Sequence, residues 1–526
     1  MLIYQVYPRS FMDSNGDGVG DLPGITQKIP YISDLGVDAV WISPFVKSPQ
    51  KDFGYDVSDY YDVDPRFGTL RDFEKLLNKA HKHSLKIIID QVWCHCSDQH
   101  PWFVQGSSST NNAKADWFVW ANGKKDGTPP NNWLSYFGGS AWTWNTARQQ
   151  YYFHQFLTSQ PTFNLRNTAV RRALMSVGKF WLEMGVDGFR LDAIHTGFAD
   201  PLLRNNPARP AFMPVAPDVP DNIPQARQIR KYSEAHADTL PFIEELRHQA
   251  DKYGAILLGE VNGENPYARA AQYTAKGRLH TAYSFSLLKN KPDAAMFKQA
   301  VVDVEKNKKR GQSFCYTLSN HDVMRVRSRW GRGSERVALL FGLCLPGHYC
   351  MYQGEELGLT EADVPYDKMV DPFGLAFYPK FKGRDGCRTP MPWDDKKAHG
   401  GFSAAQSTWL PFAKEHGRLS VTAQQKKPNS TLAFAKRIIA WRKSEPVMLT
   451  DGFRAVPASK GLIIFERFNA GYKKRVVRCV FNLTDKVIAY SIQSEAVCDV
   501  LFSVNLKRQG RLVLLQPMSA LILLTH

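Results

Sequence analysis

The sequence has few of the features that mark secreted, membrane-spanning or zinc-binding proteins. Only eight cysteines occur among 526 residues, and several lie in apolar runs, where a free thiol behaves as a small hydrophobic side chain. The run Cys94-His95-Cys96 has no second pair at ligand spacing, so zinc is not expected. No apolar run reaches the roughly 20 residues of a membrane-spanning helix, and the chain opens on a strand pattern instead of a signal peptide. These absences predict a cytoplasmic protein with reduced thiols and no membrane partner.

Charge also excludes one class of partner. The net charge is +17, which could suit nucleic acid, but the basic residues are scattered and their clusters are short, so no nucleic-acid partner is expected. Hydrophobic residues make up 43% and charged residues 22%, values that are ordinary for a globular enzyme. Aromatic residues, at 12%, could stack on sugars or fill a core.

Three stretches end an apolar run with an acidic residue. They are V-D-G-F-R-L-D-A (186–193), A-I-L-L-G-E (255–260) and S-F-C-Y-T-L-S-N-H-D (313–322), which deliver Asp192, Glu260 and Asp322. Each acid alone could simply cap the next helix. However, 62 residues separate Glu260 from Asp322, two repeats of a TIM barrel, which uses about 31 residues for each βα unit. The spacing therefore predicts three carboxylates at one end of an α/β TIM (β/α)8 barrel.

The rest of the chain adds two smaller units to this barrel. Asp192 lies 102 residues after Asp90, the end of the predicted third strand (85–90), so we expect a small inserted domain at 97–165 and a barrel formed by 1–96 and 166–448. The proline-rich loop 197–235 would form a wall or lid at the catalytic end. From residue 449 to 526, short β-branched and aromatic runs predict a C-terminal antiparallel β-sandwich.

The loop after the first strand carries alternating oxygen ligands around glycines. Such a pattern resembles a calcium-binding loop, although the closing glutamate of an EF-hand is missing. The alternative is a glycine-rich Asx turn with no ion. We expect a structural divalent cation, Ca²⁺ or Mg²⁺, and no organic cofactor. The predicted ligands are Asp13, Asn15, Asp17, the Val19 carbonyl and Asp21.

Four motifs in order resemble the signature regions of the α-amylase family of glycoside hydrolases. They are D-Q-V-W-C-H (90–95), G-F-R-L-D-A (188–193), G-E-V-N (259–262) and S-N-H-D (319–322). The opening I-Y-Q-V-Y-P-R-S-F, together with Y-Q-G-E-E (352–356) and R-T-P-M-P-W (388–393), is similar to the bacterial α-glucosidase and oligo-1,6-glucosidase branch. Cys94 and Cys96 depart from the family pattern, which usually has Asn and Thr there.

The resemblance implies a role for each matching residue. Asp192 would be the nucleophile, Glu260 the acid/base and Asp322 the third carboxylate. Asp52 and Arg388 would form an ion pair that grips the non-reducing end of the substrate. The remaining substrate-binding residues implied by the resemblance are Tyr55, His95, Phe137, Phe156, Arg190 and His321.

The expected activity is that of a retaining, exo-acting α-glucosidase with some transglucosylation on short oligosaccharides. In the relatives, Val after the nucleophile accompanies α-1,6 cleavage, and the smaller Ala193 here favours α-1,4 substrates such as maltose, or sucrose. An oligo-1,6-glucosidase and a sucrose isomerase or transglucosidase are the alternatives on the same scaffold. A non-catalytic relative should lack the three carboxylates and carry a membrane segment. This sequence has the three carboxylates and shows no such segment. We expect a monomer or homodimer.

Overall fold

A sheet of eight parallel strands forms the centre of the molecule. The computed structural model describes residues 1–526 except 217–218, 289–293, 308, 310–311, 460, 470, 472–474, 493–497 and 526. The sheet has the order β11-β10-β9-β5-β2-β1-β13-β12, and a parallel bridge between Ala282 and Phe314 joins its two ends. The predicted barrel is therefore confirmed. Its strands are β1 (Leu2–Val6), β2 (Ala39–Ile42), β5 (Lys86–Gln91), β9 (Gly188–Leu191), β10 (Ile256–Glu260), β11 (Thr281–Tyr283), β12 (Cys315–Tyr316) and β13 (His348–Tyr352).

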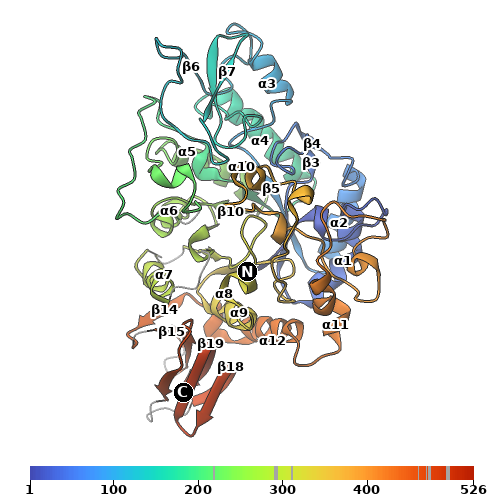
Figure 1. Ribbon diagram of the computed structural model, residues 1–526, viewed down its shortest axis with the longest axis vertical. Coiled ribbons are helices and arrows are strands. Elements are labelled where there is room, and N and C mark those ends of the chain that lie inside the picture. Colours follow the sequence, from blue (N-terminus) through green and yellow to red (C-terminus); the bar gives the residue numbers. More distant parts are fainter. Residues whose placement is uncertain are drawn as a thin grey trace.

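Helices between the strands surround this barrel (Figure 1). They begin and end at residues with the expected local chemistry. Thr69 and Asp72 form a capping box at the start of α2, and α4 ends just before Gly185, whose φ is +102°. The helices are α1 (Leu22–Asp34), α2 (Leu70–Lys82), α4 (Thr168–Glu183), α5 (Thr239–Asp251), α6 (Pro266–Tyr273), α7 (Ala294–Asn307), α8 (Val326–Trp330), α9 (Glu335–Cys344), α10 (Pro372–Phe377), α11 (Val421–Gln425) and α12 (Thr431–Ser444).

Successive residues of the barrel strands belong to two different apolar clusters. Ile3, Trp41 and Leu258 pack in a small cluster within the barrel. Their neighbours Tyr4 and Val40 pack with the helices in the large outer core. This alternation follows from the two-residue period of a strand, which directs successive side chains to opposite faces. Because both faces are buried, the strands read as continuous apolar runs.

The segment between β5 and α4 holds a small sheet of its own. The strands β6 (Trp120–Ala121), β7 (Trp142–Asn145) and β8 (Gln150–Phe153) pair antiparallel in the order β6-β8-β7, and α3 (Pro101–Gly106) precedes them. In Figure 1 this segment lies at the end of the long axis opposite the C-terminus. A hairpin of β3 (Val46–Lys47) and β4 (Asp59–Val63) lies earlier in the chain. The exact domain boundaries stay a prediction.

The C-terminal strands form one antiparallel sheet of six strands, in the part of the chain that the structure describes. The long strand β19 connects the others in this sheet. On one side, its first half pairs with β17 and its second half pairs with β16, and on the other side it pairs with β18. The strands are β14 (Gly452–Val456), β15 (Leu462–Phe468), β16 (Val476–Asn482), β17 (Ile488–Ser491), β18 (Cys498–Gln509) and β19 (Leu512–Thr525). No described helix has the length and apolar character that crossing a membrane requires.

Candidate active site

One cavity of about 690 Å³ collects the carboxylates that end the barrel strands. Glu260 is the last residue of β10, and Asp192 is the residue after β9. Asp322 lies six residues beyond β12, because β12 spans only two residues instead of the predicted run to residue 322. The polar stretch Ser319-Asn320-His321 forms the loop that carries it. The predicted residues that line this cavity are Asp52, Tyr55, His95, Phe137, Phe156, Asp192, Glu260 and Asp322.

Arg190 lies beneath the cavity and binds three carboxylates at once. Its side chain is fully buried, and its Nη1 donates to Asp90 Oδ1 at 2.8 Å and to Asp192 Oδ1 at 2.6 Å. Its Nη2 donates to Glu260 Oε2. Because the guanidinium is a small rigid plane, Asp192 and Glu260 are held within the span of one side chain. Asp90 lies in the same motif as His95, but its contact with Arg190 was not predicted from the sequence.

These buried acids do not all ionise together. Burial raises the pKa of Glu260 to about 8, because the opposing attraction of Arg190 is offset by repulsion from Asp192 and other acids. Burial also raises the pKa of Asp192 above its usual value, although Arg190 favours its charged form. At neutral pH this leaves Glu260 protonated and available as an acid beside Asp192.

Asp322 has the opposite environment. Burial alone would raise its pKa, but His321 and the guanidinium groups of Arg384 and Arg388 hold that pKa well below its usual range. Nη1 of Arg384 lies 3.2 Å and Nη2 of Arg388 3.0 Å from Asp322 Oδ1. His321 is fully buried. Burial lowers its pKa to about 3, so it is neutral at neutral pH. Asp322 is therefore a permanent negative charge beside the cavity.

Asp52 pairs with Arg384, and the predicted pair with Arg388 was wrong. Nη2 of Arg384 donates to Asp52 Oδ1 at 2.8 Å and to Asp371 Oδ1 at 2.7 Å. Arg388 instead donates from Nε to the His321 carbonyl and from Nη2 to Asp322. The two arginines stand four residues apart around a short 3-10 turn at Asp385–Cys387, so only the first reaches Asp52. Neither Arg384 nor Asp371 was foreseen from the sequence.

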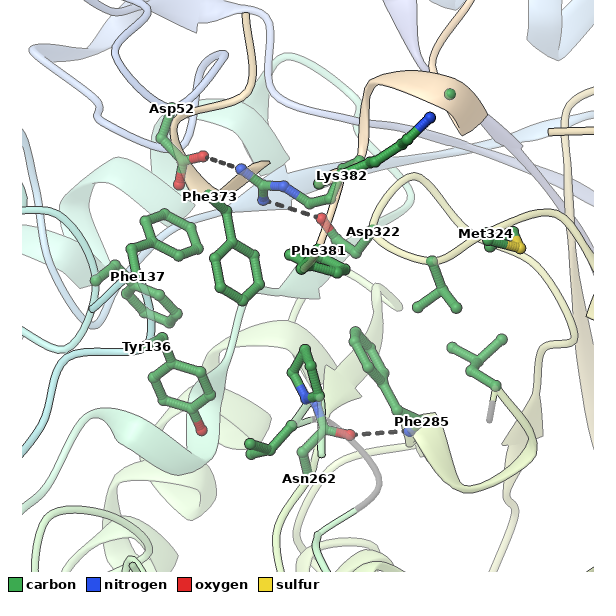
Figure 2. A pocket seen from close by; sticks show the side chains of 18 of the residues that line it. Asp52, Tyr136, Phe137, Asn262, Phe285, Asp322, Met324, Phe373, Phe381 and Lys382 are labelled. Atoms are coloured by element: carbon green, nitrogen blue, oxygen red, sulfur yellow. Dashed lines mark hydrogen bonds and ion pairs between the residues drawn. The ribbon is translucent and has the colours of Figure 1, made fainter. Parts of the chain in front are cut away.

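Aromatic side chains form the wall beside the Asp52–Arg384 pair (Figure 2). Phe156 stacks on Tyr136 at 5.1 Å between ring centroids, and Phe137 packs against Phe373 at 5.0 Å. Figure 2 shows Phe381, Phe285 and Met324 further round the same cavity. The apolar faces of such rings suit the C–H faces of a sugar. Of this set only Phe137 and Phe156 were predicted from the sequence.

A buried thiol lies close to Asp192, at the position where the family pattern usually has Asn. This is Cys94, and its Sγ donates to the Ala193 carbonyl at 3.4 Å. Ala193 has a left-handed backbone with φ of +39° and lines the cavity, a conformation that costs free energy in a residue other than glycine. Burial raises the pKa of the Cys94 thiol far above its usual value, so it stays protonated and can donate. The departure from the family pattern thus leaves this loop with a hydrogen bond.

The predicted metal loop folds as a series of Asx turns. Asp13 Oδ1 accepts the backbone N–H groups of Asn15 and Gly16, at 3.0 and 2.7 Å, and Asp21 caps α1 through Gly24. Oxygen donors of this kind suit a hard cation. Among the described residues, however, no three Asp, Glu, His or Cys side chains gather closely enough to hold a metal ion. The cation stays a prediction.

Comparison with known proteins identifies the family. The model of the alpha amylase catalytic domain matches residues 5–452. The chain belongs to the alpha-amylase family. It is 47% identical over 497 residues to a probable alpha-glucosidase of Rhizobium meliloti (strain 1021), covering 92% of this chain and 89% of that protein. It is 34% identical over 493 residues to an oligo-1,6-glucosidase of Parageobacillus thermoglucosidasius, covering 85% and 84%.

A solved structure extends the similarity to the whole chain. The crystal structure of an alpha-glucosyl transfer enzyme, XgtA, superposes with a TM-score of 0.95 at 44% identity, covering 100% of this chain and 98% of that one. The protein is therefore a glycoside hydrolase of the alpha-amylase family, with homologues named alpha-glucosidase and oligo-1,6-glucosidase.

Proposed function

We propose that this enzyme is a retaining, exo-acting α-glucosidase that releases glucose from the non-reducing end of short α-glucosides. The observation that carries the proposal is the single guanidinium of Arg190, which contacts both Asp192 and Glu260. Carboxyl groups about 5–5.5 Å apart operate in retaining glycosidases, whereas inverting enzymes separate them by about 6.5–9.5 Å to admit a water. Two carboxylates on one guanidinium suit the shorter separation.

The chemistry follows from the two protonation states. Asp192 attacks the anomeric carbon while Glu260 gives its proton to the leaving oxygen, so that a glucosyl ester forms as the glycosidic bond breaks. Esterification removes the negative charge of Asp192, and with it the repulsion that helps to keep Glu260 protonated. Glu260 then accepts a proton from water, whose oxygen bonds to the anomeric carbon and releases Asp192. Asp322 stabilises the positive charge that develops on the ring in both steps.

The exo-acting part of the proposal depends on the closed network around Arg384. Asp52, Asp322 and Asp371 all bind this one buried side chain. Gln160 adds a hydrogen bond from its Nε2 to Asp52 Oδ2 at 3.0 Å. Charged groups fixed in this way can bind the hydroxyl groups of a terminal glucose and block a longer chain from passing.

The preferred linkage is proposed from Ala193. Its side chain is small and lines the cavity next to Asp192, which leaves room for an aglycone joined through its ring carbon, as in maltose or sucrose. Transfer of glucose to another sugar is a second candidate activity, favoured by the full-length similarity to the alpha-glucosyl transfer enzyme. Oligo-1,6-glucosidase activity is the alternative.

One assay tests these proposals together. Maltose, isomaltose and sucrose are each incubated with the enzyme, and the first products are separated by chromatography with detection of the anomer. We expect α-glucose first, together with transfer products at high substrate concentration, and faster turnover of maltose or sucrose than of isomaltose. β-Glucose as the first product would contradict retention, and kcat/KM favouring isomaltose would contradict the role given to Ala193.

A further inference from the structure

Asn262 contacts the proposed acid/base directly and has a fixed orientation. It lies two residues after β10, is 3% exposed and lines the cavity. Its Oδ1 accepts the backbone N–H of Phe285 at 2.9 Å, the dashed line at the base of Figure 2. A backbone N–H can only donate, so the amide cannot be turned round. The Asn262 Nδ2 must therefore point to Glu260, where it donates to Oε1 at 2.9 Å.

The other carboxyl oxygen of Glu260 has both of its acceptor sites occupied. Oε2 accepts a hydrogen bond from Arg190 Nη2 and lies 3.4 Å from the hydroxyl of Tyr283. That hydroxyl oxygen accepts from Nε and Nη2 of Arg190, at 3.1 and 2.8 Å, which leaves its hydrogen to point to Oε2. A carboxyl oxygen has two lone pairs. Only Oε1 keeps a lone pair that Arg190, Tyr283 and Asn262 do not use.

We propose that Asn262 is a positioning residue that orients Glu260 so that Oε1 carries the transferred proton. This rests on the proposed retaining mechanism. In the first step the O–H bond at Oε1 breaks and the proton goes to the leaving oxygen. The Asn262 N–H then stabilises the carboxylate that remains. In the second step the same Oε1 takes a proton from water as its oxygen bonds to the sugar.

The amide also links two barrel strands. Phe285 begins the 3-10 turn Phe285–Leu287 that follows β11. The turn at the end of β11 therefore fixes, through Asn262, the orientation of Glu260 at the end of β10. The charged and titratable groups that face Glu260 come from several elements, and each contributes to its titration. They are Arg190 and Asp192 from β9 and its end, Asp90 from β5, Tyr283 from β11, Asp322 from the loop after β12, the Cys94 thiol, and His195, whose Nδ1 lies 3.3 Å from the Glu260 carbonyl oxygen.

The test compares pH profiles of kcat/KM for p-nitrophenyl α-glucoside in the wild type, Asn262→Ala and Asn262→Asp. A donor to the ionised form lowers a pKa, so its loss in Asn262→Ala should move the alkaline limb up by about one pH unit. Asn262→Asp keeps the size of the side chain and the oxygen that accepts the Phe285 N–H, but it points a second oxygen at Glu260 Oε1 where Asn262 has a donor. The alkaline limb of this variant should therefore move up at least as far as that of Asn262→Ala. We expect kcat to fall on the order of tenfold to hundredfold in both, because the proton is misplaced.

Asn265→Ala is the matched control, because Asn265 caps α6 through the Ala268 N–H. Its melting temperature should fall while its alkaline limb stays in place. Circular dichroism establishes that each variant is folded. An unmoved limb in either folded Asn262 variant would overturn the proposal, as would an equal shift in the control. An inactive wild type would overturn both this proposal and the proposed function, whereas an active wild type with unmoved variants would overturn this one alone.

Discussion

The pairing of Asp52 with Arg384 leads to a prediction that separates two neighbouring arginines. A double-mutant cycle combines Asp52→Asn with Arg384→Gln, and a parallel cycle combines it with Arg388→Gln. Asp52 and Arg384 are in contact at 2.8 Å, and their side chains are only 6% and 8% exposed. Solvent therefore screens the pair weakly.

The expected coupling energy follows from this geometry. A hydrogen bond to a charged group contributes about 1.5–3 kcal/mol, so we expect a coupling of about that size between Asp52 and Arg384. In kcat/KM it corresponds to a factor of roughly 10 to 150. Arg388 binds the His321 carbonyl and Asp322, so its coupling to Asp52 should be less than half as large. Asp52→Asn or Arg384→Gln alone should lower kcat/KM by a larger factor than the one that corresponds to the coupling energy, because each leaves its buried partners unpaired.

The assay is hydrolysis of p-nitrophenyl α-glucoside by all single and double variants, with melting temperatures recorded in parallel. Arg247→Ala is the control, because Arg247 pairs with Asp251 on the exposed surface of α5, where such a pair contributes about 0–1 kcal/mol. It should leave kcat/KM unchanged. A larger coupling for Arg388 than for Arg384 would refute the assignment, and so would no coupling in either cycle.

Three further predictions concern the acids and the metal loop. A plot of kcat/KM against pH should be bell-shaped. Activity should fall above pH 8 because Glu260, with its pKa of about 8, loses its proton, and it should fall on the acid side because Asp192, with its raised pKa, gains one. A flat profile through pH 8 to 9 would contradict this. Asp192→Ala should fold but lose activity by orders of magnitude, and retention of about a tenth of wild-type turnover would exclude Asp192 as the nucleophile. Removing divalent cations with EDTA should lower the melting temperature, and adding Ca²⁺ or Mg²⁺ should restore it. The variant Asp17→Ala should abolish this response. Equal melting curves of the wild type with and without EDTA would argue for an Asx turn without an ion.

The strand pattern alone determined the barrel and the acids of its catalytic end. Apolar runs that lead to Asp or Glu, with an interval of two βα repeats between Glu260 and Asp322, are typical of a parallel barrel with its chemistry at the carboxyl ends of the strands. That is why Asp192, Glu260 and Asp322 could be placed in one cavity from their positions in the chain. The alternation of buried side chains in β1 or β2 is likewise local, because it depends only on the period of a strand.

Only the tertiary structure decided which groups meet across the cavity. Arg384 and Arg388 are chemically identical and four residues apart, and Asp52 lies more than 300 residues earlier, so no local pattern could choose between them. The orientation of the Asn262 amide depends in the same way on a backbone N–H of the turn that follows the next strand, β11. Contacts of this kind are fixed by the closure of the barrel and by loop geometry, which place distant residues together. The sequence shows which acids stand at the ends of the strands, and the fold determines which side chains contact them.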